Sequence, residues 1–100
     1  MALYAIVTTD HPGSGDVRRE KLRAHLAHIE QTLDTLAVAG PLRDADGAIT
    51  GSLLVVHAES VDDARRMLEE DPYYQAGIWS SIEISAFSAA AGSWVGGKTW

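Results

Sequence analysis

Cysteine is absent from this sequence of 100 residues. Its absence excludes disulfide bonds, metal sites with thiolate ligands and cysteine nucleophiles. Cations are scarce as well: eight lysine and arginine residues stand against fourteen aspartate and glutamate residues, for a formal net charge of −6. Because nucleic acids and anionic membranes bind clustered cations, we expect neither of them as the main partner.

Long hydrophobic runs are also missing. No apolar stretch reaches the roughly 20 residues that a membrane-spanning helix needs. The chain opens on Leu3–Val7, which is rich in strand formers and lacks the basic region of a signal peptide. We therefore expect a cytoplasmic protein without a membrane partner, and its length suits one domain with one core.

The first half of the chain has the pattern of a strand followed by a long helix. Leu3–Thr9 is short, apolar and typical of a buried strand. A loop of structure-breaking residues follows, and Asp16 is expected to cap a helix from Val17 to Ala37. Gly40-Pro41 is expected to stop that helix, because Gly accepts a positive φ and Pro cannot continue a helix.

The second half predicts a hairpin, a helix and a last strand. Asp46-Gly47 is a turn signal between two arms, of which Ile49–Ala58 is expected to be a central strand buried on both faces. Ser60 is expected to cap the next helix, which ends before Pro72 and is followed by one further turn. Trp79–Phe87 is the last expected strand.

This order of elements predicts the fold class. Strand, helix, hairpin, helix and strand make the ferredoxin-like βαββαβ pattern, an α+β fold with two helices on one face of a four-stranded antiparallel sheet. The other face is left partly apolar by residues such as Phe87, so we expect a homodimer. Residues 1–88 are expected to form the domain. In residues 89–100, Trp94 and Trp100 are expected to pack on the domain or on the partner subunit.

One histidine lies on the margin of the first helix's apolar face. Helical spacing places Leu22, Leu26 and Ile29, followed by Leu33 and Leu36, on one stripe that is expected to face the core. His25 lies beside this stripe, where burial and neighbouring groups tune an imidazole. Two interpretations stay open: a core-edge histidine with one satisfied hydrogen bond, or a functional residue.

Asp71 also has two interpretations. An aspartate before Pro72 is a good N-cap for a short helical turn with proline in its first position. Alternatively, Asp71 approaches His25, fixes its tautomer and prepares it for proton transfer near neutral pH. The sequence does not show whether these two side chains meet.

Two other motifs are expected to carry no function. Gly92–Thr99 fits the phosphate-loop pattern letter for letter, but only Trp100 follows, so no helix opens there to hold a phosphate. His25 and His28 are three residues apart, yet no further ligand residues support a metal site. We therefore expect neither a metal nor a nucleotide cofactor.

Four groups of residues, which span roughly Leu3 to Phe87, occur in the order and spacing typical of one family. They are Ala24-His25-Leu26, Ala39-Gly40-Pro41, Asp46-Gly47 with Gly51-Ser52, and Asp71-Pro72-Tyr73 with Ala76-Gly77. In these residues the chain resembles the YciI-like (YCII-related) family. The resemblance implies a dimeric α+β barrel and a pocket between helices and sheet, with His25 and Asp71 as a His–Asp dyad. A chlorinated-hydroquinone dehydrochlorinase belongs to this family, and muconolactone isomerases belong to its superfamily.

One position departs from the family pattern. Members often carry arginine three residues before the histidine, where this sequence has Leu22. Arg18 matches another frequent arginine and lies on the same side of the helix as His25. We therefore expect Arg18 to hold an anionic substrate group and Arg23 to lie on the surface.

Two functions remain open, and the sequence does not decide whether the protein is an enzyme. The leading hypothesis is a cofactor-independent lyase or isomerase that transfers a proton on a small organic molecule. His25 would be its general acid and base, Asp71 its orienting partner, and the substrate-binding residues would be Arg18, Gly40, Pro41, Ser52 and Tyr73. The alternative is a non-catalytic module with the same dimeric fold, which binds a small ligand or has a regulatory role.

Overall fold

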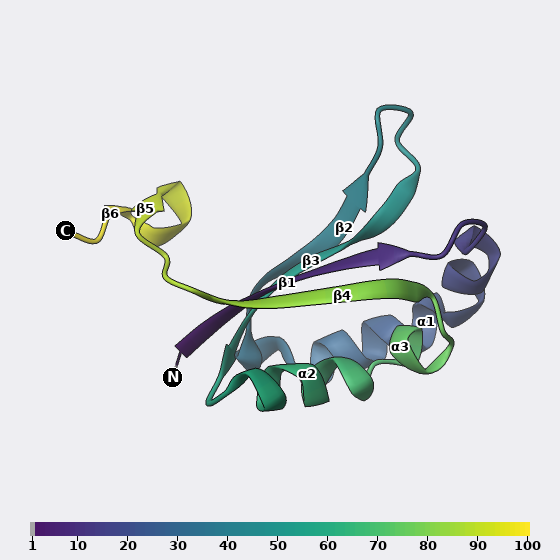
Figure 1. Ribbon diagram of the computed structural model, residues 1–100, viewed down its shortest axis with the longest axis horizontal. Coiled ribbons are helices and arrows are strands. Elements are labelled where there is room, and N and C mark those ends of the chain that lie inside the picture. Colours follow the sequence, from purple (N-terminus) through teal and green to yellow (C-terminus); the bar gives the residue numbers. More distant parts are fainter. Residues whose placement is uncertain (1) are drawn as a thin grey trace.

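Four antiparallel strands and three helices make up the domain in the computed structural model, which describes residues 2–100 (Figure 1). The sheet has the order β2-β3-β1-β4. Its strands are β1 (Ala2–Asp10), β2 (Leu36–Arg43), β3 (Ile49–Ala58) and β4 (Trp79–Phe87). The helices are α1 (Gly15–Gln31), α2 (Val61–Glu69) and α3 (Pro72–Gln75). This architecture confirms the expected ferredoxin-like α+β fold.

All three helices lie against one face of the sheet, and the core fills the space between them (Figure 1). Ile6 of β1 and Leu54 and Val56 of β3 point to this side, where Ala64 and Leu68 of α2 bury against them. These residues follow the alternation of a strand and the 3.6-residue period of a helix. Each fully buried aliphatic side chain contributes about 2 kcal/mol to stability.

The opposite face of the sheet stays open in the single chain. Val7, Leu53 and Phe87 point to this side, and each has more than a third of its surface exposed. The prediction for Ile49–Ala58 is therefore right about its central position and wrong about burial on both faces. The helices all lie on one face of the sheet and leave the other without a layer (Figure 1).

The first helix is shorter than the sequence suggested. α1 ends at Gln31, a 3-10 turn follows at Leu33–Thr35, and Leu36 already belongs to β2. The prediction that the helix runs to Ala37 is wrong because residues from Leu36 onward pair with β3. This pairing satisfies backbone groups and buries Leu36 against the core, and it overrides the helical spacing of the leucines.

Gly40 and Pro41 lie inside a strand instead of ending a helix. Pro41 pairs with Ser52, and β2 is an edge strand of the sheet. An edge strand tolerates proline, because the missing N–H falls on the side that has no neighbouring strand. The expected role of this pair as a helix stop is therefore wrong.

The start of α1 also differs from the prediction. Its N-cap residue is Ser14, whose side chain makes no capping bond and donates instead to the His11 carbonyl oxygen at 2.6 Å. Asp16 lies within the first turn, where a carboxylate interacts favourably with the helix dipole. Leu22 and Leu26 are 45% and 50% exposed, so the leucine stripe does not face the core.

The structure confirms several local predictions. Gly47 takes a φ of +86° in the turn between β2 and β3, a conformation that glycine adopts without strain. Ser60 caps α2 and accepts a hydrogen bond from the Asp63 N–H at 3.1 Å. The predicted further turn after Pro72 is α3.

The C-terminal segment folds on itself, away from the helices (Figure 1). It contains β5 (Ala91–Gly92), a 3-10 turn at Ser93–Val95 and β6 (Gly97–Lys98), which pairs with β5. Trp94 and Trp100 are 82% and 76% exposed. No helix among residues 2–100 combines the length and the apolar character that crossing a membrane requires.

Candidate functional site

His25 and Asp71 meet between α1 and the start of α3. The His25 Nδ1 atom lies 2.9 Å from Asp71 Oδ1 and 3.0 Å from Oδ2. An ionised carboxylate can only accept hydrogen bonds, so this contact places the proton of a neutral imidazole on Nδ1. The Nε2 atom then carries a lone pair, and it has no hydrogen-bond partner within residues 2–100.

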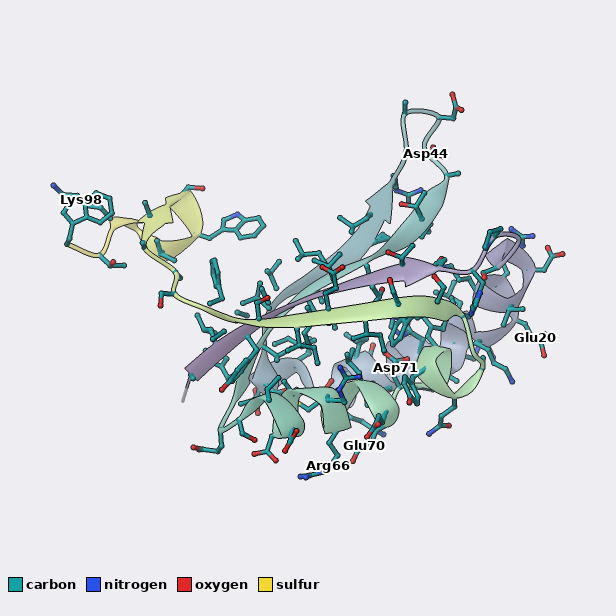
Figure 2. The ribbon with its side chains drawn as sticks, viewed as in Figure 1. Glu20, Asp44, Arg66, Glu70, Asp71 and Lys98 are labelled. Atoms are coloured by element: carbon teal, nitrogen blue, oxygen red, sulfur yellow. The ribbon has the colours of Figure 1, made fainter. Side chains whose placement is uncertain are left out.

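Asp71 performs both of the roles that the sequence left as alternatives. Its Oδ1 atom accepts the backbone N–H of Tyr73 at 2.9 Å, which caps α3. The same carboxylate holds His25, and its side chain is only 3% exposed. Figure 2 shows Asp71 among the side chains packed between helices and sheet, whereas Arg66 and Glu20 point outward. The cap and the imidazole together hold the carboxylate through Oδ1, which leaves it little freedom to turn.

Tyr73 holds the imidazole from its face. The two rings stack with centroids 3.9 Å apart and planes 4° from parallel. The Tyr73 hydroxyl donates to the backbone oxygen of Arg18 at 3.2 Å, and the residue is 2% exposed. Burial raises the pKa of the Tyr73 hydroxyl above its ordinary value, while the nearby Arg18 guanidinium opposes this shift. Tyr73 is therefore a neutral, fixed wall behind His25.

Arg18 has an acidic partner inside the chain, which the sequence did not indicate. Its Nε and Nη2 atoms lie 2.6 and 3.0 Å from the two carboxylate oxygens of Asp10. Nη2 also donates to Ser52 Oγ at 3.2 Å. Asp10 therefore balances the charge of Arg18, so the guanidinium offers N–H donors to the cavity without an uncompensated charge.

Gly51 allows the strands beside this cluster to approach. A Cβ atom at this position would lie 1.9 Å from the backbone oxygen of Thr8, closer than any real contact. Only glycine fits, because any side chain would push β3 away from β1. The close approach brings the Gly51 carbonyl oxygen to 3.4 Å from Arg18 Nη2.

A cavity of about 430 Å³ lies between α1 and the sheet. All seven residues that the sequence proposed for the site line it: Arg18, His25, Gly40, Pro41, Ser52, Asp71 and Tyr73. Leu22, Leu26 and Ile29 form one apolar wall, because the leucine stripe of α1 faces this space. The cavity therefore joins an apolar slot to a polar end. Its volume lies in the range of small-molecule sites.

Sequence reasoning missed Asp10 and Trp79. Asp10 was assigned to a loop, yet it ends β1 in line with Ile6 and Thr8, so extending the strand alternation would have placed it on the helix side. Trp79 pairs with Asp10 across a register shift between Thr9 and Asp10. This irregularity turns Trp79 toward the cavity, and no simple alternation predicts it.

The side chains around His25 can support acid–base chemistry. Within residues 2–100, no three or more His, Cys, Asp or Glu side chains gather in a way that could hold a metal ion. The His25 imidazole has one nitrogen fixed by a carboxylate and one nitrogen free, which is the arrangement of a general base. Arg18 and Ser52 supply polar groups beside it.

Comparison with known structures shows a similar protein with a bound ring. The 5-chloro-2-hydroxyhydroquinone dehydrochlorinase of Burkholderia phenoliruptrix AC1100, in complex with 2,5-dihydroxybenzoquinone, is 33% identical with a TM-score of 0.80. The match covers 91% of this chain and 96% of that protein. A NIPSNAP family protein of Agrobacterium tumefaciens is 17% identical with a TM-score of 0.55, over 93% of this chain and 89% of the other, and shares the fold alone.

Sequence comparison identifies the family. Protein YciI of Escherichia coli O6:H1 is 30% identical over 93 residues, which covers 85% of this chain and 95% of that protein. An uncharacterized protein of Haemophilus influenzae is 26% identical over 92 residues, or 84% of this chain and 94% of the other. The family model of the YCII-related domain matches residues 2–88. The chain therefore belongs to the YCII-related, YciI-like family.

Proposed function

We propose that this chain is a small acid–base enzyme that performs elimination or isomerisation on a flat ring compound. One observation carries the proposal: Asp71 fixes the Nδ1 atom of His25, and this leaves Nε2 free in a side chain that lines the cavity. The similarity to a dehydrochlorinase with a bound quinone supports it.

The reaction begins when Nε2 of His25 removes a proton from the substrate. The electrons of the broken bond form a new double bond, and in an elimination the chloride leaves with its bonding electrons. The net loss is HCl. Asp71 stabilises the imidazolium that forms, because its carboxylate is already bonded to Nδ1. In an isomerisation, the same imidazolium returns the proton to another atom of the ring.

The rest of the cavity holds the ring. Leu22 and Leu26 are half-exposed in the single chain, and a flat apolar ligand would cover them. The Arg18 Nη1 atom donates to a ring oxygen, while Gly40 and Pro41 line the opposite wall. Ser52 orients the guanidinium through its 3.2 Å contact.

Chloride release from 5-chloro-2-hydroxyhydroquinone tests the function. We expect His25→Gln to lose about 10²- to 10⁴-fold in rate, the usual contribution of a general base. His28→Gln is the matched control, because His28 lies one turn away and does not line this cavity. An unchanged rate in His25→Gln would overturn the mechanism. Wild-type protein that binds 2,5-dihydroxybenzoquinone but releases no chloride from this substrate would favour the alternative, a ligand-binding module.

We also propose that two copies of the chain pair through the open faces of their sheets. Leu53, Val7 and Phe87 present apolar surface there, and a second sheet would cover it. Leu53→Lys should shift the mass measured by light scattering at micromolar concentration from dimer to monomer. Leu33→Lys, at an exposed position in the turn after α1, is the control and should leave the dimer intact.

The C-terminal segment, residues 89–100, is proposed to pack on the partner subunit. Trp94 and Trp100 expose most of their surface in the single chain, and aromatic anchors contribute most when buried. Removing residues 89–100 should weaken the dimer, as measured by sedimentation at decreasing concentration. An equal dimer dissociation constant with and without this segment would refute the idea.

A further inference from the structure

A second, outer cavity of about 660 Å³ adjoins the one that holds His25. The loop from Asp10 to Gly15 forms one side of it, and residues 47–50 of the β2–β3 hairpin form the other. Arg18, Arg43 and Ile49 line both cavities, so the two spaces meet at these residues. A ligand whose ring lies in the inner cavity can therefore extend a substituent into the outer one.

Three arginines line the outer cavity, and they differ in whether a carboxylate of the chain already balances their charge. Arg18 is held by Asp10 with both carboxylate oxygens. Arg19 pairs with Asp16, one turn of the helix away. Arg43 donates from Nη1 to the backbone oxygen of Gly47 at 2.8 Å, and within residues 2–100 it takes part in no ion pair.

Asp44, the acidic residue next to Arg43 in the chain, does not form an ion pair with the Arg43 guanidinium. Asp44 turns one carboxylate oxygen, Oδ1, to the backbone N–H groups of Asp46 and Ala48, at 2.9 and 3.0 Å, and lines neither cavity. Figure 2 shows Asp44 toward the outer end of the hairpin. The bond from Arg43 to Gly47 holds its guanidinium at the base of the same turn, which lowers the ordering cost of binding an anion.

We propose that Arg43 binds a carboxylate carried by the ring substrate. The inner cavity has an apolar wall of leucines, where an ionised group would lose its hydration without compensation. The carboxylate therefore points outward to Arg43, whose planar guanidinium matches its two oxygens. This assignment rests on the proposed function of the inner cavity. It names the substrate class as a carboxylated ring, whereas 5-chloro-2-hydroxyhydroquinone probes the acid–base step alone because it lacks the group that Arg43 binds.

Two compounds that differ by one carboxylate test the assignment. Titration calorimetry compares 2,5-dihydroxybenzoate with hydroquinone on the full chain. We expect wild-type protein to bind the carboxylated ring about tenfold more tightly, the effect of one hydrogen-bonded charge in a partly open site. Arg43→Gln should abolish this preference and leave the affinity for hydroquinone unchanged. Arg43→Lys should keep part of it.

Arg19→Gln is the matched control, because it removes the same charge from the same cavity at a side chain already paired with Asp16. It should keep the tenfold preference. The proposal is overturned if wild-type protein binds both compounds equally or binds neither, if Arg43→Gln retains the preference, or if Arg19→Gln loses it to the same extent. A failure of the proposed acid–base function can be distinguished from a failure of this assignment. The first is measured by chloride release in His25→Gln, and the second by ligand affinity in Arg43→Gln.

Discussion

Two side chains of α1 each pair with a carboxylate, but the two pairs differ in how many of their nitrogen atoms remain without a hydrogen bond. Arg18 and His25, seven residues or two helical turns apart, each reach a carboxylate from another element: Asp10 at the end of β1 and Asp71 before α3. In the first pair both side chains are at most 10% exposed, and the guanidinium bonds both oxygens. In the second, the imidazole is 19% exposed and keeps one nitrogen unbonded.

This difference separates a structural pair from the pair to which we assign the chemistry. Arg18 carries a permanent charge that Asp10 balances, so the pair fixes the geometry of its end of the cavity. In the His25 pair, Asp71 holds the imidazole through Nδ1 alone, and the Nε2 atom has no hydrogen-bond partner within residues 2–100. Tyr73 couples the two pairs, because it stacks on His25 and bonds the backbone of Arg18.

Removing Asp10 should have the largest effect on stability. Asp10→Ala leaves the buried Arg18 charge without compensation, and we expect a loss of about 3–5 kcal/mol in the free energy of unfolding, measured by urea denaturation. Asp16→Ala breaks the exposed pair with Arg19 and should cause little change. Equal losses in the two variants would show that the Arg18 pair is not a structural anchor.

Asp71→Asn should separate the two roles of Asp71. Asparagine caps a helix as well as aspartate does, so stability should change by less than about 1 kcal/mol. The negative charge beside His25 is lost, and turnover should fall by about a hundredfold. Asp71→Ala should lose the same activity and, in addition, about 1 kcal/mol from the missing cap. If Asp71→Asn keeps full turnover, the pair serves only as a cap.

Tyr73→Phe should change how stability responds to alkaline pH. Because burial raises the pKa of Tyr73 above 10.0, its contribution is fully present below about pH 10 and is lost as the pH rises through the folded-state pKa. The variant should lack this alkaline loss and should cost about 1 kcal/mol at neutral pH through the missing hydroxyl bond. Tyr74→Phe, at a partly exposed position, is the control and should retain the alkaline loss.

Ser52→Ala should have the smallest effect. It removes one acceptor of Arg18 Nη2, which keeps its bond to Asp10, so we expect a loss of about 0.5 kcal/mol in unfolding experiments. A loss as large as that of Asp10→Ala would mean that Ser52 and Asp10 hold Arg18 equally.

Local sequence signals predicted the element order and several turns. These signals act over a few residues, so they could be recognised without the tertiary structure. They are strand alternation, the Ser60 cap and the Asp46-Gly47 turn. The end of α1 was not, because Leu36 continues the helical spacing while its pairing with β3 decides its conformation. The leucine stripe was correctly placed on one face. It was wrongly assigned to the core, because a cavity lies where the sequence suggested packing.

The sequence by itself determined the α+β order, the family resemblance and seven of the residues that line the inner cavity, but not Arg43. The tertiary structure showed the contact of His25 with Asp71 that the resemblance implied. It alone decided the partner of Arg18, which is Asp10, and left Arg43 without an acid among the described residues. The physical reason is distance along the chain. His25 and Asp71 are 46 positions apart, and their contact exists because α1 and α3 pack on the same sheet face. No local pattern encodes that packing.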